Sequence, residues 1–331
     1  MSTAHAERKR TMIIEMLKAL LEGIVEGITE WLPISSTGHM ILIDEFVKLQ
    51  VSDQFLALFL VVIQIGAILA VIIMYFHKLN PFSSKKTPAQ RKSTWRLWGM
   101  VVVGCIPAAI VGFALDDWVN EHFYNKVCVA AMLILYGVVF IVLERRNRRR
   151  FQEARAGLAI SGERPRGKHA RVAAAPVSSD ELDARAEEQL FKITDVDDID
   201  WKTALKIGLF QVLAIIPGTS RSGATIIGGM LTGCSRTAAA EFTFFLAIPV
   251  MLGWGAVKTA KFVLAGLTMT TTEIAVLVVG VVSAFVMSII SIKFLMGYIK
   301  KNDFTAFGIY RIIVGVLVIA YFAFETMGML P

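Results

Sequence analysis

The chain has 331 residues, of which 55% are hydrophobic, and its mean hydropathy is +0.61. Both values are high for a soluble protein, and several apolar runs approach the roughly 20 residues that a membrane-spanning helix needs. The net charge of +7 does not indicate nucleic-acid binding, because the basic residues cluster in short segments between apolar runs. That distribution is typical of the cytoplasmic connections of a polytopic membrane protein.

Residues 12–47 form an apolar segment interrupted by a polar stretch at residues 26–39, Glu-Gly-Ile-Thr-Glu-Trp-Leu-Pro-Ile-Ser-Ser-Thr-Gly-His. Glu26 and Glu30 are four residues apart and share one face of a helix. Pro33 cannot continue that helix, because it lacks an N–H and its ring clashes with the preceding turn. The segment predicts a helix, a polar loop and a second helix. We expect these to form a re-entrant hairpin, because each half is short for a span and irregular backbone is allowed at membrane depth where protein or water covers it.

Three spans follow this hairpin, at residues 55–76, 97–115 and 127–143. The connection between the first two is basic, and a run of arginines follows the third. By the positive-inside rule both of these connections lie in the cytoplasm. The acidic connection between the second and third spans then lies outside.

Residues 145–200 form a polar insert that is basic at its start and acidic at its end. Its few apolar residues give little potential for a packed core. We expect a polar cytoplasmic linker with some helix that is largely mobile. A solvated loop is a better interpretation than a segment for docking a partner.

Residues 203–232 repeat the pattern of the first hairpin, because Pro217 interrupts an apolar helix and a Ser/Thr/Gly loop with Arg221 follows. Three more apolar runs then predict spans at residues 239–260, 274–295 and 305–325.

The two halves form an internal repeat, since each is one broken hairpin followed by three spans. Pairing Ser35 with Ser220 also pairs Gly38 with Gly223, at an offset of 185 residues. Counted from the cytoplasmic loops, the first hairpin enters the membrane from outside and the second from inside, so the halves are inverted. The predicted fold is an all-α integral membrane protein with an inverted-topology repeat, six transmembrane helices and two re-entrant helix-loop-helix hairpins. Its parts are the first repeat at residues 1–144, the linker at 145–200 and the second repeat at 201–331.

The two loops concentrate ionisable groups at membrane depth, where such groups are costly and usually serve function. Arg221, with Ser220 and Ser222 beside it at a helix start, suits a phosphate, because a guanidinium and oriented N–H groups bind anions. Glu26 and Glu30 suit a hard divalent cation, since Mg²⁺ takes one or two carboxylates together with substrate phosphates. The residues predict phosphoryl chemistry in a cleft at membrane depth.

Other interpretations stay open for several of these residues. The arginine could neutralise one of the glutamates for stability instead of binding substrate. Ser222, Thr219 and Thr225 suit helix packing as well as function. Gln64 and Gln211 are polar residues in apolar runs that either line the cavity or bond one helix to another.

Residues 26–39 and 217–225 resemble the two signature motifs of the undecaprenyl-diphosphate phosphatase family, also called the bacitracin-resistance protein family. The similarity covers nearly the whole chain apart from residues 1–11 and 145–200. It implies the inverted-repeat fold and the hydrolysis of undecaprenyl diphosphate to the monophosphate and phosphate, which recycles the lipid carrier of peptidoglycan synthesis. It also implies a divalent cation, Mg²⁺ or Ca²⁺, and an active site toward the periplasmic side of the bacterial inner membrane.

On this sequence the family's acidic pair falls on Glu26 and Glu30, which would hold the metal or act as base. Its serine, histidine and phosphate-binding arginine fall on Ser36, His39 and Arg221. Ser36 is our first choice as nucleophile and His39 as proton shuttle or alternative nucleophile, while a direct attack by water stays open. The predicted substrate-binding residues are Ser35, Thr37, Gly38, Thr219, Ser220, Arg221, Ser222 and Gly223.

The expected partners are the lipid substrate, whose prenyl tail would lie between spans against apolar walls, and the surrounding membrane lipids. No nucleic acid is expected, and a homodimer is an assembly that the sequence allows. The rival function is a transporter or flippase of a phosphate-bearing lipid, because inverted repeats with broken helices are also an alternating-access architecture. The enzyme is favoured because a carrier needs no nucleophile and no acid–base set.

Overall fold

A computed structural model describes residues 2–162 and 178–327, and the regular structure in these residues is helical apart from one isolated bridge. Within them, six helices are long and apolar enough to cross a membrane. Five of these contain the predicted span, and the first covers the span predicted at residues 55–76 except for its last two residues, which confirms the all-α class and the six spans. The six helices are α3 (Asp53–Met74), α5 (Pro88–Phe123), α6 (Lys126–Gly162), α10 (Arg236–Leu264), α11 (Thr271–Ile299) and α12 (Thr305–Thr326).

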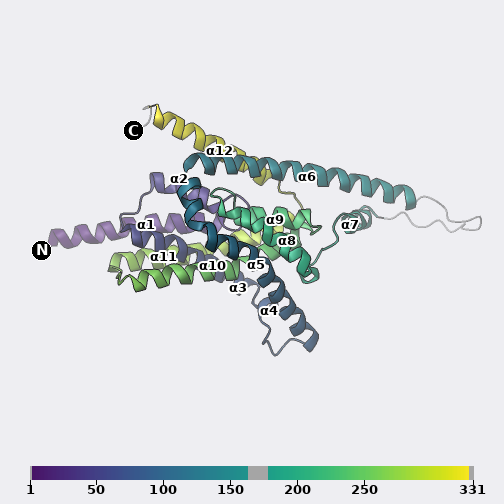
Figure 1. Ribbon diagram of the computed structural model, residues 1–331, viewed down its shortest axis with the longest axis horizontal. Coiled ribbons are helices and arrows are strands. Elements are labelled where there is room, and N and C mark those ends of the chain that lie inside the picture. The colour runs from purple at the N-terminus through teal and green to yellow at the C-terminus, as the bar shows by residue number, and fades with distance from the viewer. Residues whose placement is uncertain (1, 163–177, 328–331) are drawn as a thin grey trace, which may run out of the picture.

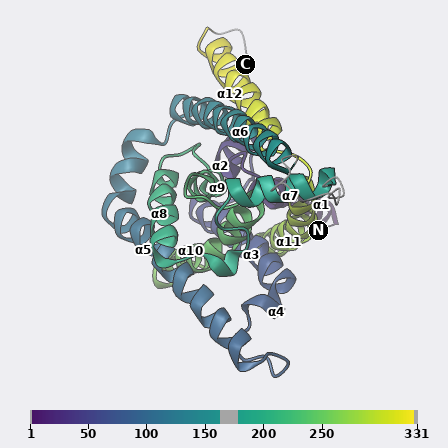
Figure 2. The same cartoon turned by 90° about the vertical axis from the view of Figure 1, so that its right-hand side faces the viewer.

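The other long helices form two broken pairs. α1 (Ser2–Thr29) and α2 (Ser36–Phe46) flank the loop with Pro33. α8 (Trp201–Val212), the 3₁₀ turn η2 (Leu213–Ile215) and α9 (Arg221–Leu231) flank the loop with Pro217. Figure 2 shows α2 and α9 near the centre of the bundle, with the spanning helices around them. The two proline-containing loops therefore lie inside the protein.

Helices of one half pack against helices of the other half. α1 runs along α11, α8 runs along α5, and α6 pairs with α12 (Figure 1). Two glycines at the 185-residue offset permit close approach in the first two pairs. A Cβ on Gly23 would lie 2.4 Å from the Gly280 carbonyl oxygen of α11, and one on Gly208 would lie 2.3 Å from the Gly104 carbonyl oxygen of α5.

Ser35 and Ser220 start α2 and α9 with the same unusual backbone geometry. Their φ angles are 76° and 72°, and they are the non-glycine residues with positive φ in the described part of the chain. Each side chain caps its helix by accepting a hydrogen bond from the backbone N–H of Gly38 or Gly223, at 3.3 and 3.1 Å. Such strained backbone persists only where the surrounding structure fixes it, often at functional sites.

The predicted cytoplasmic connections lie at one end of the molecule, on the right of Figure 1, where α4 (Phe76–Leu79) and the far half of α6 are found. Ion pairs join them to one another and to the ends of neighbouring helices. The pairs are Lys78 with Asp195 at 3.5 Å, Arg148 with Asp303 at 2.7 Å, and Arg236 with Glu144 at 2.6 Å. The two predicted cytoplasmic connections thus share one side, as a single cytoplasmic face requires.

Two stretches of the polar insert differ from the linker that we predicted. The third span continues as α6 through its arginines to Gly162, because Ala, Arg, Glu and Gln favour helix beyond the membrane. After α7 (Ser179–Leu190), three apolar side chains around η1 (Val196–Asp198) are buried, namely Phe191, Val196 and Ile199. Residues 163–177 of the predicted linker lie outside the described residues.

The acidic connection predicted outside the second span is also helical, because α5 continues to Phe123 before α6 begins at Lys126. Acidic residues lower the hydropathy and so mark the end of a predicted membrane span, but they do not interrupt a helix. The outer connection is therefore short.

Candidate active site

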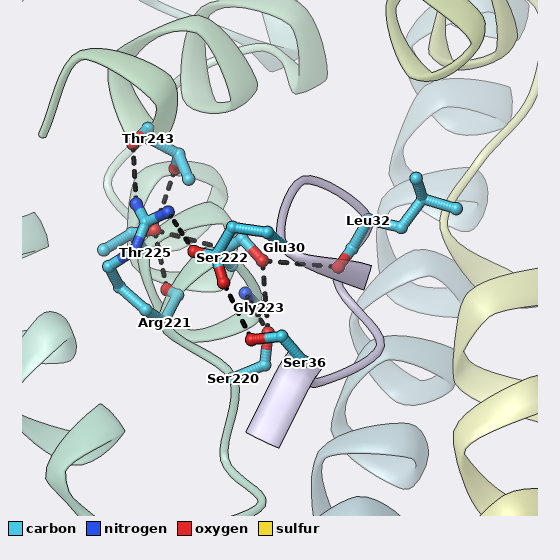
Figure 3. A network of polar contacts seen from close by, with 9 residues as sticks. All are labelled: Glu30, Leu32, Ser36, Ser220, Arg221, Ser222, Gly223, Thr225 and Thr243. Carbon is cyan, nitrogen blue, oxygen red and sulfur yellow. Dashed lines mark hydrogen bonds and ion pairs between the residues drawn. The ribbon is translucent and has the colours of Figure 1, made fainter. Parts of the chain in front are cut away.

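The two loops meet at Glu30, which follows the end of α1 (Figure 3). Arg221, the first residue of α9, places its Nη2 atom 2.8 Å from Glu30 Oε1. Ser36, the first residue of α2, donates its hydroxyl to Glu30 Oε2 at 2.7 Å. Ser222 Oγ also reaches the Leu32 carbonyl oxygen, at 3.4 Å. The structure thus brings a hydroxyl, a carboxylate and a guanidinium from distant parts of the sequence into direct contact.

The Arg221 guanidinium is held on several sides. Its Nη1 donates to the Thr243 carbonyl oxygen of α10 at 2.9 Å, and its Cζ lies 6.0 Å from the centroid of the Trp31 ring. Trp31 is itself buried and packs edge-to-face on Phe244, so it is a packing aromatic and not an interfacial one. Arg221 Nε is buried and has no hydrogen-bond partner among the described residues. With five N–H donors on a guanidinium, Arg221 keeps donors for an anion.

The contact between Arg221 and Glu30 is an ion pair with little solvent access. The Arg221 side chain is 11% exposed and that of Glu30 is 5% exposed. Neutralisation of a glutamate by Arg221, an alternative that the sequence left open, therefore occurs in this structure. Removal of one partner from such a pair is strongly destabilising, because the other charge stays buried alone.

Glu26 lies one turn before Glu30 on α1 and is 1% exposed. Its Oε1 atom is buried without a hydrogen-bond partner among the described residues. The charges of Glu30 and Arg221 are close enough to interact with the Glu26 carboxyl group. Two carboxylates on one helix face, one with an unused oxygen, fit a hard divalent cation. The described residues contain no cluster of three or more His, Cys, Asp or Glu for a metal, so phosphate oxygens would have to complete its shell.

His39 points away from this cluster. Its Nδ1 lies 2.7 Å from the Ser35 carbonyl oxygen, and its Nε2 lies 2.8 Å from the Tyr310 hydroxyl on α12, whose ring stacks on the imidazole. A nitrogen that faces a carbonyl is the donor, so the neutral ring accepts from Tyr310. No hydrogen bond joins His39 to Ser36 or Glu30 in the described structure, and its role in proton transfer stays a prediction.

A cavity of about 430 Å³ adjoins the cluster. The predicted site residues on its wall are Glu30, Ser36, Thr37, Ser220, Arg221 and Ser222. The other predicted residues are not part of the wall, namely Glu26, Ser35, Gly38, His39, Thr219 and Gly223. Ser35, Gly38 and Gly223 shape the helix starts through the caps described above, while Thr225 bonds to Thr243 and serves packing.

The rest of the cavity wall is largely apolar. α5 and α10 supply most of it, including Phe113, Pro249 and Trp254. Gln64 and Gln211 are polar members of the wall, so the cavity-lining interpretation of these two residues is the one the structure supports.

Sequence reasoning missed Arg311, which is fully buried on α12. Its Nη1 donates to the Pro33 carbonyl oxygen at 3.1 Å, and its Nη2 donates to those of Gly218 and Thr219 at 2.9 and 3.0 Å. Carbonyl oxygens of Met132 and Leu133 on α6 accept from it as well. The sequence contained a signal for this residue, namely an arginine within the apolar run 305–325. Charged residues at membrane depth are rare and usually have a role.

We expect Arg311→Met to lower the thermal midpoint of the purified protein in detergent, by the equivalent of about 3–5 kcal/mol, because it strips buried carbonyl groups of both loops of their donor. Arg148→Met is the matched control, since Arg148 makes one ion pair at an exposed position and its loss should change the midpoint little. An Arg311→Met protein as stable as the control would show that Arg311 does not hold the loops.

Comparison with known proteins places this arrangement in a family. The model of the family described as bacitracin resistance protein BacA matches residues 19–317. An undecaprenyl-diphosphatase of Enterococcus faecalis is 49% identical over 314 residues, which are 95% of this chain and 100% of that protein. An undecaprenyl-diphosphatase of Desulfitobacterium hafniense is 50% identical over 316 residues, or 95% and 99% of the two chains. A relative of that name from Streptococcus thermophilus is 49% identical over 309 residues, or 93% and 94%.

The family match spans five of the six long apolar helices and the first part of α12, and it includes both loops that meet at Glu30. The chain is therefore a multi-pass membrane protein, and it belongs to the bacitracin resistance protein BacA family.

Proposed function

We propose that this protein hydrolyses undecaprenyl diphosphate to undecaprenyl phosphate and inorganic phosphate. Relatives that carry the name undecaprenyl-diphosphatase share about half of their residues with it over nearly the whole chain. The observation that carries the proposal is the direct contact of Glu30 with both Ser36 and Arg221 at the wall of a cavity. A transporter needs no hydroxyl held against a carboxylate, and the names of the relatives give that alternative no support.

Ser36 is the proposed nucleophile. Its Oγ attacks the terminal phosphorus while its proton passes to Glu30 Oε2, 2.7 Å away. The bond from that phosphorus to the bridging oxygen breaks, and undecaprenyl phosphate leaves. Water then attacks the phosphoserine, Glu30 returns its proton to Ser36 Oγ, and the phosphate is released with the protons of the water.

Arg221 and the start of α9 bind the diphosphate in this proposal. The unused donors of the guanidinium, the hydroxyls of Ser220 and Ser222, and the positive end of a helix all suit phosphate oxygens. A bound diphosphate competes with Glu30 for Arg221. Substrate binding thus weakens the ion pair and leaves Glu30 a better base for Ser36.

Glu26 and Glu30 are the proposed ligands of a divalent cation, Mg²⁺ or Ca²⁺. Such a cation would neutralise charge on the diphosphate and on the leaving group. The unpartnered oxygen of Glu26 supports this assignment, because a buried carboxylate oxygen without a partner is costly unless something positive occupies its surroundings.

Two re-entrant hairpins in an inverted repeat are the proposed topology. The N-terminal half of α1 lies beside the chain that follows α2, since Gln50 N donates to Glu15. The chain before α8 lies beside the end of α9, since Lys192 N donates to the Gly233 carbonyl oxygen. Both ends of each hairpin therefore share a side, while the tips of the hairpins meet in the centre, at Glu30 and Arg221.

The proposed location is the bacterial inner membrane, with the active site toward the periplasm. The cavity wall uses the later part of α5, around Phe113, and the later part of α10, around Trp254. Both helices begin at the basic, cytoplasmic end of the molecule, so these parts lie toward the other side. The apolar wall supports a long prenyl tail as ligand.

Purified protein in detergent should release phosphate from undecaprenyl diphosphate. Chelator should abolish this activity, and added Mg²⁺ or Ca²⁺ should restore it, because the cation screens two carboxylates from the diphosphate. Activity that survives exhaustive chelation would contradict the metal role alone. A metal-loaded, folded protein that releases no phosphate would contradict the proposed function.

Arg221→Lys should lower turnover by at least about 100-fold, because it keeps a charge near Glu30 but loses the planar set of donors. Arg221→Ala should lose more activity and also lower the thermal midpoint, and adding Glu30→Gln should restore the midpoint without restoring turnover.

The matched control for these variants is Arg236→Ala, which breaks a buried ion pair with Glu144 outside the site. It should lower the midpoint while the folded fraction keeps its turnover. Near-normal phosphate release by stable Arg221→Lys protein would exclude Arg221 from substrate binding.

A thiol at position 121 should react with an impermeant maleimide on intact cells, in a background without Cys105, Cys128 and Cys234. The Glu121→Cys substitution places this thiol at the outer end of α5. The Lys85→Cys substitution places a thiol in the basic connection instead, and that thiol should react only after the cells are permeabilised. The reverse labelling pattern would invert the proposed orientation and the side of the reaction.

A further inference from the structure

Gln211 is a buried amide whose polar atoms form no hydrogen bond with the described residues. It lies in the last turn of α8 and is 2% exposed. Neither its Nε2 nor its Oε1 has a hydrogen-bond partner among the described residues. Most buried side-chain polar atoms are hydrogen-bonded, and an unpaired one is destabilising, so an amide with both ends unpaired requires an explanation.

The surroundings of Gln211 connect it to the active site. It lies on the wall of the cavity that also exposes Glu30, Ser36 and Arg221. One turn earlier, Gly208 packs α8 against the backbone of α5 at Gly104, which fixes the position of this part of α8. No bond from Gln211 to a neighbouring helix is present in the described structure, and the cavity is the adjoining space in which a ligand could supply its partner.

The chemistry of the amide suits the ligand of this cavity. An amide offers two N–H donors, whereas the non-bridging oxygens of a diphosphate only accept. The offset of 185 residues that pairs Ser35 with Ser220 also pairs Glu26 with Gln211. A second carboxylate at this position would repel a diphosphate, while a neutral amide binds it and adds no charge.

We propose that Gln211 is a substrate-binding residue that donates its amide N–H groups to the diphosphate. This inference rests on the proposed phosphatase function and adds a donor that neither signature motif contains. Gln211 acts on substrate affinity and orientation, together with Arg221, and takes no part in proton transfer.

The test uses Gln211→Met, which keeps the length of the side chain and removes its hydrogen bonds. The probe is a prenyl methylenediphosphonate, which retains the phosphate oxygens and cannot be hydrolysed between the phosphorus atoms. We expect its Kd to rise about 10- to 100-fold and kcat/KM for undecaprenyl diphosphate to fall by a similar factor. The thermal midpoint without ligand should not fall, because the variant removes two unpartnered polar atoms.

The matched control is Ser288→Ala on α11. Ser288 Oγ is likewise buried without a partner among the described residues, but it is not part of the cavity wall. This variant should leave the Kd, kcat/KM and midpoint close to those of the unmodified protein. A second substitution, Gln211→Glu, keeps the shape and adds a charge, and it should weaken binding of the probe further than Gln211→Met.

An unchanged Kd in folded Gln211→Met protein would overturn the inference, and so would a lower midpoint with unchanged affinity, which indicates a structural role. These outcomes are separate from failure of the proposed function. That failure would appear as absence of phosphate release from the unmodified protein, whatever the affinity of the variants for the probe.

Discussion

The architecture depends on a way to keep two irregular loops at the centre of a membrane protein, where backbone carbonyl groups cannot bond to water. Arg311 provides it, because its guanidinium donates to Pro33 in one loop and to Gly218 and Thr219 in the other. No carboxylate is ion-paired with Arg311 in the described structure. Its charge faces carbonyl dipoles and the Tyr136 ring at 5.5 Å. Because one rigid group holds both loops, Arg221 reaches Glu30 across 191 positions of the sequence.

The charges of the site explain why a cation belongs in the proposal. Glu26 and Glu30 lie near a single guanidinium, that of Arg221. A diphosphate adds more negative charge, and at short range in a medium of low dielectric constant the repulsion would be large. In the proposed function, a divalent cation held by the carboxylates would offset part of this repulsion. Arg221 would then be available to bind the substrate.

Hydropathy predicted the spans well, because span length and apolar composition are local properties. The interruption of a helix near Pro33 and near Pro217 was also readable, since proline chemistry sets it. The caps at Ser35 and Ser220 were not predicted, because they depend on a positive φ angle that the sequence does not show. Arg311 was missed because its partners are carbonyl groups, which leave no pattern in the sequence. The position of His39 against Tyr310 depends on how α2 packs beside α12. Side-chain direction of that kind is set by tertiary packing and not by spacing along the chain.

The proposed inverted repeat divides structural and chemical tasks between its equivalent positions. Positions that shape the backbone carry the same residue in both halves, as in the pairs Gly23 and Gly208, Ser35 and Ser220, and Gly38 and Gly223. Other equivalent positions differ, as in Glu26 and Gln211, and in Ser36 and Arg221. In the proposed mechanism, the first half therefore supplies carboxylates and a nucleophile, while the second supplies donors for phosphate. Because the proposed inversion turns the two loops toward each other, equivalent backbone positions lie on opposite sides of the site. Different side chains at these positions let one side supply the carboxylates and the other side supply the donors that an anionic substrate requires.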